Sequence, residues 1–252
     1  MKTKHTSKKN IYLPRVDSTN RELFRIKDSK SLPEGTVLWT DEQYSGKGMG
    51  SSTWESEKGL NITASFLLFP EFLEPENQFY LNKAISLSVC DTVADILKDE
   101  FRTEIKWPND ILVNENKIAG ILIENIIQGS MLKCTVAGIG INMNQTLFGD
   151  YPIKPTSVKL LTGKRFVVTE AIDILSGHLQ QRYKALKNDN TKLLDEDYLN
   201  KLYRFQKAAN YRANFKSFKG KICGIDKFGK LLLETSKGNI KAYDFKEVQF
   251  ID

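Results

Sequence analysis

The 252-residue chain has few of the side chains on which many enzymes depend. It contains three cysteines, Cys90, Cys134 and Cys223, without a C-x-x-C pair, and two histidines, His5 and His178. A disulfide framework, a zinc knuckle, a histidine-dependent triad and an H-E-x-x-H zinc site therefore find no support. If the chain is an enzyme, its lysines, aspartates, asparagines and backbone amides must do the chemistry.

Long apolar runs are also absent. No segment approaches 18 consecutive apolar residues, and Met1–Asn10 lacks the apolar stretch of a signal peptide. We therefore expect a cytoplasmic protein that does not contact a membrane. The formal net charge of +6 lies mostly in the first 30 and last 50 residues. This charge favours anionic partners, but it is too small and too scattered to indicate nucleic acid by itself.

The hydrophobic periodicity predicts an α+β fold, and 40% hydrophobic residues are enough for a sizeable core. The predicted strands are 36–40, a half-buried strand at 61–69, and an antiparallel meander at 104–107, 111–114, 117–126 and 132–143. The predicted helices are 16–29, with Thr19 as N-cap, 78–101, 169–186 and 192–204. We expect a mixed, largely antiparallel sheet with the helices on one face.

The composition changes near Phe205. Short strands follow it, separated by turn glycines at Gly220, Gly224, Gly229 and Gly238. This pattern predicts a small barrel. We divide the chain into a loose basic tail at 1–10, a large domain at 11–205 and the barrel at 206–252.

Two glycine-rich segments fail the common nucleotide-binding patterns. The segment 138–143 begins like G-x-G-x-x-G but ends in Met143, and 46–51 fails at its last position. Lys47 is followed by Gly48 rather than Ser or Thr, which excludes a P-loop. Nucleotide binding must therefore rest on other residues.

Four polar or glycine-rich features still point beyond plain packing. The loop Glu42–Ser56 has closely spaced glycines around Lys47, so it is either an anion cradle or a flexible surface loop. Asp17–Asn20 at a helix start can be explained by capping alone. Lys106–Asp110 has ordinary turn residues with an added Lys and Trp. Lys117 enters an apolar strand, which is costly unless it meets an anion.

Two strand glycines add a fifth feature. Gly138 and Gly140 occupy a strand in which glycine usually marks the close approach of a backbone or a ligand. Each of the five features is weak alone.

Taken in order, these features resemble the motifs of the biotin protein ligases. The matching segments are Asp17–Asn20, Gln43–Ser56, Lys106–Asp110, Lys117–Glu124 and Gly138–Asn142. The resemblance runs from about Ile11 to Ile251, and 224–233 is similar to the small SH3-like domain of that family. It implies a class II synthetase-like catalytic domain at 11–205 and an SH3-like domain at 206–252.

The resemblance also implies an activity. Such a ligase activates biotin with MgATP to biotinyl-5′-adenylate and passes biotin to one lysine of a carboxylase carrier protein. The implied biotin-binding residues are Ser18, Thr19, Asn20, Gln43, Gly46, Lys47, Gly48, Met49, Lys117, Gly120, Gly138 and Gly140. The implied ATP-binding residues are Lys47, Trp54, Asn109, Lys117 and Asn142, with Trp54 and Asn142 at the adenine.

The implied catalytic residues are Lys117, Lys106 and Asp110. The family pattern places Lys117 at the biotin carboxylate, and Asp110 would accept a proton from the acceptor lysine or orient it. The ligands of Mg²⁺ are not predicted.

Two departures from the family pattern stand out. Many members read G-R-G-R where this chain has Met49 after Gly48, and methionine cannot grip a phosphate as a guanidinium does. The chain therefore either holds its adenylate less firmly or uses another cation there. Some members also carry an N-terminal helix-turn-helix, for which the 16 residues before Asp17 leave no room. We expect no sequence-specific DNA binding.

Two other functions would explain part of the sequence. A lipoate or octanoate ligase or transferase shares the fold, but it would be expected to show a different lysine context and often a catalytic cysteine, whereas Cys90 and Cys134 have no flanking base. A basic nucleic-acid-binding module would account for the charge but not for Lys117 or the Trp54 loop. Whether the protein is a monomer or a homodimer is left open.

Overall fold

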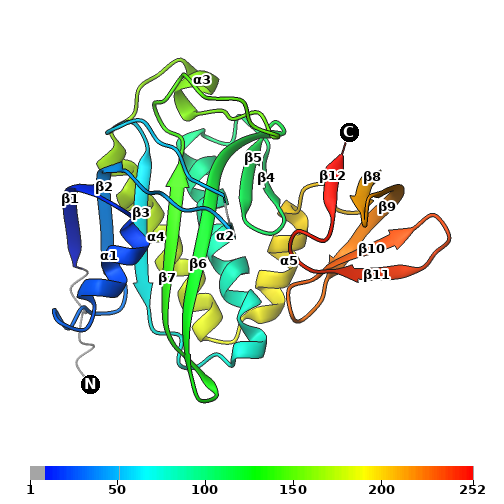
Figure 1. Ribbon diagram of the computed structural model, residues 1–252, viewed down its shortest axis with the longest axis horizontal. Helices are drawn as coiled ribbons and strands as arrows, with labels where there is room; N and C mark the ends of the chain where they lie inside the picture. The colour runs from blue at the N-terminus through cyan, green and yellow to red at the C-terminus, as the bar shows by residue number, and fades with distance from the viewer. Residues whose placement is uncertain (1–8, 51, 252) are drawn as a thin grey trace.

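The larger of two sheets forms the centre of the molecule in the computed structural model, which describes residues 9–50 and 52–251 (Figure 1). Its seven strands have the order β1-β2-β3-β7-β6-β5-β4. Their bounds are β1 Asn10–Val16, β2 Val37–Gln43, β3 Ile62–Leu68, β4 Thr103–Lys106, β5 Asp110–Val113, β6 Asn116–Gln128 and β7 Met131–Ile141. Strands β1 and β2 are parallel and the other neighbours antiparallel. The predicted mixed, largely antiparallel sheet and its meander are confirmed.

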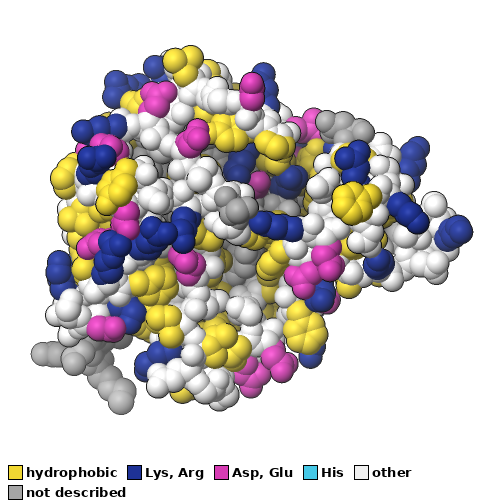
Figure 2. Space-filling model, in the orientation of Figure 1, with side chains coloured by type: hydrophobic (Ala, Val, Ile, Leu, Met, Phe, Trp, Pro, Cys, Tyr) yellow, Lys and Arg dark blue, Asp and Glu magenta, His cyan; other side chains and the backbone are white. Residues whose placement is uncertain are grey.

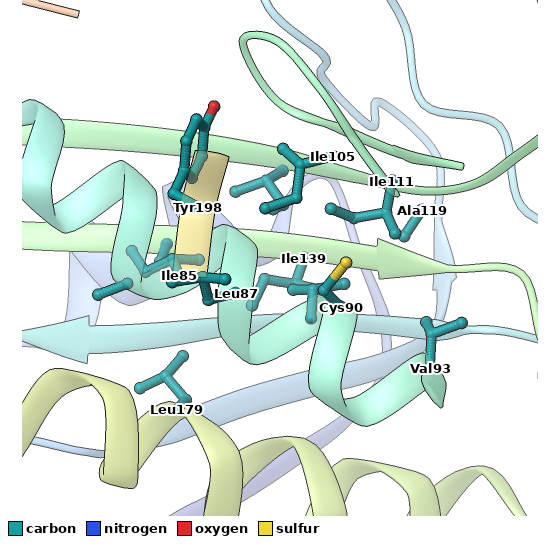
Figure 3. Packing of buried hydrophobic residues seen from close by; sticks show 14 of the residues in the cluster. Ile85, Leu87, Cys90, Val93, Ile105, Ile111, Ala119, Ile139, Leu179 and Tyr198 are labelled. Atoms are coloured by element: carbon teal, nitrogen blue, oxygen red, sulfur yellow. The ribbon is translucent and has the colours of Figure 1, made fainter. Parts of the chain in front are cut away.

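Three helices cover one face of this sheet: α2 Phe79–Ile96, α4 Val168–Lys187 and α5 Thr191–Lys201. Apolar side chains of α2 meet those of β4 to β7 in a continuous core, with Leu179 of α4 and Tyr198 of α5 packed beside them (Figure 3). Because α2 lies between the sheet and the other two helices, it is buried almost all round rather than along one stripe. No helix in the described part of the chain is long and apolar enough to cross a bilayer.

Helix α1, Thr19–Ile26, lies on the opposite face, so the expectation that all helices share one face is wrong for it. Its Leu23 packs with Leu67 and Val136, whereas Phe66 belongs to the core under α2. Successive side chains of a strand point to opposite faces, so the two cores lie on the two sides of the sheet. Strand β3 is therefore buried on both faces, not half-buried as predicted.

The start of α1 also differs from the prediction. Ser18 is the N-cap, with extended φ and ψ of −156° and 132°, and Thr19 is already helical. The Ser18 side chain makes no capping hydrogen bond, and the Thr19 hydroxyl, which was predicted to cap the helix, bonds to Gln43 Oε1 instead. The polar residues here are therefore not explained by capping.

Three short elements were missed. Strand β1 overlaps the expected loose tail, 1–10, at its last residue, because Asn10 already pairs with Val37. Its apolar run is short and Pro14 interrupts it, which an edge strand tolerates. Residues 1–8 of the expected tail lie outside the described part. The others are η1, Pro75–Asn77, and α3, Val158–Thr162.

The second sheet is small and antiparallel. Its strands are β8 Ala208–Ala213, β9 Lys216–Ile225, β10 Leu231–Thr235, β11 Ile240–Tyr243 and β12 Gln249–Ile251, in the order β11-β10-β9-β8-β12. It begins just after Phe205, where the composition changes. That 11–205 and 206–252 are separate domains, the second SH3-like, stays a prediction.

Several contacts attach this second sheet to the large sheet and its helices. Trp107 Nε1 donates to the Gly229 carbonyl at 2.9 Å, and the Trp107 ring lies 5.3 Å from that of Phe245. Gly229 also packs so closely on Phe79 that a β-carbon would overlap the ring. Trp107 follows β4 directly, so the second sheet is fixed to the end of that strand.

Two glycine substitutions test this attachment. Gly229 and Gly238 have φ of +90° and +78°, so alanine at either is strained by roughly 1–2 kcal/mol. Only Gly229 has a neighbour in the way, since nothing lies within 4 Å of a β-carbon at Gly238. In urea unfolding, we expect Gly229→Ala to lose about 1–3 kcal/mol more than Gly238→Ala. Equal losses would contradict the close packing of Gly229 on Phe79.

Candidate active site

A cavity of about 730 Å³ lies on the α1 side of the large sheet, within the range typical of ligand pockets. Lysine and arginine side chains gather around the middle of this face (Figure 2). The cavity brings all five sequence motifs together. The predicted site residues that line it are Ser18, Thr19, Asn20, Gln43, Lys47, Gly48, Met49, Trp54, Lys106, Asn109, Asp110, Lys117, Gly120, Gly138 and Gly140.

The floor of the cavity is formed by glycines of β6 and β7. Gly120 and Gly140 are register partners, and the Trp54 indole lies against both. A β-carbon at Gly120 would lie 2.9 Å from Trp54 Cζ3, and one at Gly140 would overlap the ring. The close approach predicted for Gly140 is therefore made by Trp54.

The Trp54 indole nitrogen is buried and has no hydrogen-bond partner among the described residues. A buried donor without a partner costs roughly 1–3 kcal/mol. A ligand that offers an acceptor beside Gly140 would remove this cost. The position of Trp54 thus favours a bound molecule over an empty site.

A network of polar side chains forms one end of the cavity. Gln43 Oε1 accepts from Thr19 N at 2.8 Å and from Thr19 Oγ1 at 3.1 Å. Ser65 Oγ lies 2.7 Å from Thr19 Oγ1 and 2.6 Å from Asn20 Oδ1. Asn20 Nδ2 donates to Glu124 Oε2 at 2.7 Å. Thr19, Asn20 and Ser65 are buried, so this end holds fixed polar groups away from water.

The strand glycine at 138 makes room for this network, because a β-carbon there would overlap Asn20 Oδ1. Ser65 is its register partner on β3. Sequence reasoning missed Ser65, although a serine in the middle of an apolar strand was a usable signal. Glu124 was noted as part of a motif but was not assigned to the site.

Lys117 and Asp110 form an ion pair at the centre of the site. Lys117 Nζ lies 2.6 Å from Asp110 Oδ1, and their side chains come from the adjacent strands β6 and β5. Lys117 Nζ is also 5.8 Å from the centre of the Trp54 ring. The anion that Lys117 was expected to need is Asp110.

Lys106 adds a second cation beside this pair. Its Nζ lies 5.0 Å from the centre of the Phe250 ring. Burial lowers the pKa of Lys106 below its ordinary range, and the charges of Lys117 and Arg204 lower it further, while Asp110 opposes them. The described lining has four lysines and one carboxylate, Asp110, so the cavity is suited to anions.

The glycine loop is a short hairpin-like excursion. Trp54 N donates to the Gly46 carbonyl at 3.1 Å, Gly48 N donates to the Ser52 carbonyl at 2.8 Å, and Lys47 bridges to Thr53. Gly46 packs behind the lining, where a β-carbon would lie 2.5 Å from the Trp54 carbonyl oxygen. The glycine-rich part of the predicted loop, 45–53, contains no helix or strand among its described residues, and Ser51 lies outside them.

The two predicted asparagines have structural partners. Asn109 Nδ2 donates to the Ile121 carbonyl at 2.8 Å and lines the cavity. Asn142 Nδ2 donates to the Thr156 carbonyl at 2.9 Å. In the described part of the chain, Asn142 and Gly46 do not line the cavity. Asn109 is therefore part of the wall of the cavity, and Asn142 supports that wall from behind.

The second sheet contributes to the cavity as well. Its residues in the lining are Lys246, Val248, Gln249 and Phe250. Sequence reasoning missed all four, because no local pattern indicates where a C-terminal sheet docks.

Comparison with known proteins agrees with the motifs. Residues 12–142 match the biotin/lipoate A/B protein ligase family. The bifunctional ligase/repressor BirA of Bacillus spizizenii is 31% identical over 96% of this chain and 74% of its own length. The biotin–[acetyl-CoA-carboxylase] ligase of Paracoccus denitrificans is 26% identical over 90% of this chain and 94% of its own.

A solved structure is also similar. The biotin protein ligase of Aquifex aeolicus in complex with biotin and ATP superposes with a TM-score of 0.80 at 27% identity, covering 97% of this chain and 100% of that one. The family match spans more than half of the chain and the BirA match nearly all of it. The chain therefore belongs to the biotin/lipoate A/B protein ligase family.

Proposed function

We propose that this protein is a biotin protein ligase, which joins biotin to ATP as biotinyl-5′-adenylate and then transfers it to a lysine of a carboxylase carrier protein. The observation that carries the proposal is that a buried polar end and a lysine-rich centre adjoin in one cavity. The matched relatives are named as ligases of this kind, and the similar Aquifex structure holds biotin and ATP.

The polar end suits the ureido ring of biotin. That ring has N–H donors and a carbonyl acceptor, and each left unmatched in a dry pocket would cost roughly 1–3 kcal/mol. Ser18, Thr19, Asn20 and Gln43 offer fixed donors and acceptors there. Ser65 holds Thr19 and Asn20 in place, so we add it as a positioning residue.

The first step brings two anions together. A biotin carboxylate oxygen attacks the α-phosphorus of ATP, the bond to the β-phosphate oxygen breaks, and pyrophosphate leaves. In a site of low dielectric the repulsion between these groups is large, and fixed cations offset it without reorganising. Lys117, Lys106 and Lys47 supply them, with Lys117 at the carboxylate. Trp54 stacks on the adenine and gains an acceptor for its N–H.

The second step needs a neutral amine. The acceptor lysine attacks the acyl carbon, AMP leaves, and a proton must leave the attacking nitrogen. A free lysine has a pKa of about 10.4 and is charged at neutral pH. Asp110 is the carboxylate at the centre of the lining, and Lys117 holds it in place at 2.6 Å. We assign to Asp110 the orientation and deprotonation of the acceptor lysine.

The described residues do not form a magnesium site made of protein ligands alone. The described residues contain no group of three His, Cys, Asp or Glu that could hold a metal ion. Mg²⁺ commonly binds through substrate phosphates and waters with few protein ligands. We therefore assign no residue to the metal and derive no step through it.

The lipoate or octanoate alternative is disfavoured by the cysteines. Burial raises the pKa of Cys90 to about 12 and also raises that of Cys134. Neither thiol forms a nucleophilic thiolate near neutral pH, and neither lines the cavity. The nucleic-acid-binding alternative leaves the buried polar end unexplained. The absence of sequence-specific DNA binding and a cytoplasmic location stay predictions.

The central test is biotin-dependent exchange of pyrophosphate into ATP. Lys117→Ala removes the cation at the carboxylate, and we expect exchange to fall at least about 100-fold, since a lost charged contact to a transition state costs roughly 3 kcal/mol. Lys184→Ala, on the exposed side of α4, is the matched control and should exchange normally. Exchange supported by lipoate instead of biotin would refute the substrate.

The lowered pKa of Lys106 predicts how the KM for ATP depends on pH. Its lowered pKa means that it loses its charge at a lower pH than an ordinary lysine. The KM for ATP should therefore begin to rise on the alkaline side below the usual lysine range, because one cation is lost. Lys106→Arg, whose guanidinium stays charged, should move this rise to higher pH. Identical pH profiles for both proteins would show that Lys106 does not serve ATP.

Substitution of Gly140, in the floor of the cavity, should affect the binding of ATP and not that of biotin. Gly140→Ala displaces the Trp54 ring, and base–aromatic stacking is worth roughly 1–3 kcal/mol, so we expect the KM for ATP to rise about tenfold or more. The KM for biotin should change much less. Gly177→Ala, where a β-carbon meets nothing within 4 Å, is the control. An unchanged KM for ATP in Gly140→Ala would remove Trp54 from the nucleotide site.

A further inference from the structure

The turn between β11 and β12 carries a lysine into the cavity from outside the five motifs. Lys246 lines the cavity together with Lys47, Lys106 and Lys117, although it lies near the end of the chain. It is exposed, and no carboxylate lies within ion-pair distance of it among the described residues. A lysine placed in this way is open to an anionic ligand.

The turn holds this lysine in a fixed place. Asp244 N donates to Glu247 Oε2 and Phe245 N donates to Asp244 Oδ1, both at 2.8 Å. Glu247 N donates to the Asp244 carbonyl at 3.1 Å, which closes the turn. Phe245 packs on Trp107 at 5.3 Å, so the turn is fixed to the motif that carries Lys106 and Asp110.

Lys246 meets the glycine loop from the opposite side. A β-carbon at Gly50 would overlap its ammonium nitrogen, so the amine lies directly against that residue. Gly50 follows Met49, the uncharged residue that stands where many members of the family have arginine. Met49 also lines the cavity. The ammonium therefore lies beside the loop position from which a cation is missing.

We propose that Lys246 binds the phosphates of ATP and of the adenylate, and so supplies the charge that Met49 does not. The inference rests on the proposed function, because it assigns the phosphates of that reaction to a residue of the second sheet. The second sheet is then part of the nucleotide site rather than only a neighbour of it.

Phosphate fits this lysine better than the carrier protein does. Lys246 faces the same cavity as three other lysines, and such a cluster of cations is suited to a compact anion. A carrier surface would need cations spread over the outer rim. The two partners can be told apart, because pyrophosphate exchange requires no carrier.

The experiment measures carrier-free ATP–pyrophosphate exchange with biotin. A charged hydrogen bond is worth roughly 1.5–3 kcal/mol, so we expect Lys246→Ala to raise the KM for ATP about tenfold and to leave the KM for biotin within about twofold. Lys246→Arg should keep most of the affinity. Lys241→Ala, an exposed lysine of β11 that does not line the cavity, is the matched control and should behave as the unaltered protein.

A second arm tests the exchange of roles with Met49. Met49→Arg in the Lys246→Ala background returns a cation to the loop and should restore the KM for ATP at least in part. Release of adenylate, followed in the absence of carrier, should be faster in Lys246→Ala and slow again in the double variant. Thermal unfolding of each variant checks that the fold is intact.

The outcomes separate this inference from the proposed function. Normal exchange and normal adenylate retention in Lys246→Ala would overturn the inference alone. A rise only in the KM for carrier during transfer would also overturn it, and would assign the lysine to carrier docking. No biotin-dependent exchange in the unaltered protein would overturn the proposed function and this inference together.

Discussion

Repulsion between a carboxylate and a triphosphate is the constraint on which the site depends. Water would screen it, but water would also hydrolyse the activated acyl group, so the protein must screen it with its own cations. Four lysines from four separate segments line the described cavity. Burying a cation is unfavourable and a neighbouring cation adds to the cost: burial lowers the pKa of Lys106, and the charge of Lys117 lowers it further. Asp110 moderates this and lies within reach of the step in which a proton must leave.

The cavity lies on one face of the large sheet, and the placement of the helices follows from this. Helices α2, α4 and α5 bury the other face and supply most of the core, so they stabilise the fold without approaching the chemistry. On the site face, α1 covers only part of the sheet, and its first turn provides the buried polar end. Strands β6 and β7 have glycines at Gly120, Gly138 and Gly140. The Asn20 side chain and the Trp54 ring occupy the space that larger side chains would fill there.

How far the sequence predicts this structure depends on the range of the interactions. The meander and the long helices follow from local periodicity and turn residues, and both are confirmed. The motif segments stand out because each breaks a local rule, as Lys117 does in an apolar strand, but the roles of their residues come from the resemblance to the biotin protein ligases. The face taken by α1 and the pairing of β1 with β2 depend on contacts between segments distant in sequence. No local pattern specifies such contacts, and Ser65 acquires its role only once β3 lies beside β7 and α1.

The same reasoning changes how a motif departure is interpreted. Met49 alone indicates a weaker grip on phosphate, because interpretation of a motif assumes that each position works with its sequence neighbours. The fold brings Lys246, nearly two hundred positions later, against the very next residue, Gly50. Binding depends on charge at a point in space and not on the segment that supplies it. The loss of a cation from one loop therefore weakens a site only if the folded chain places no other cation there. To decide this, the positions of all the elements around the cavity must be known.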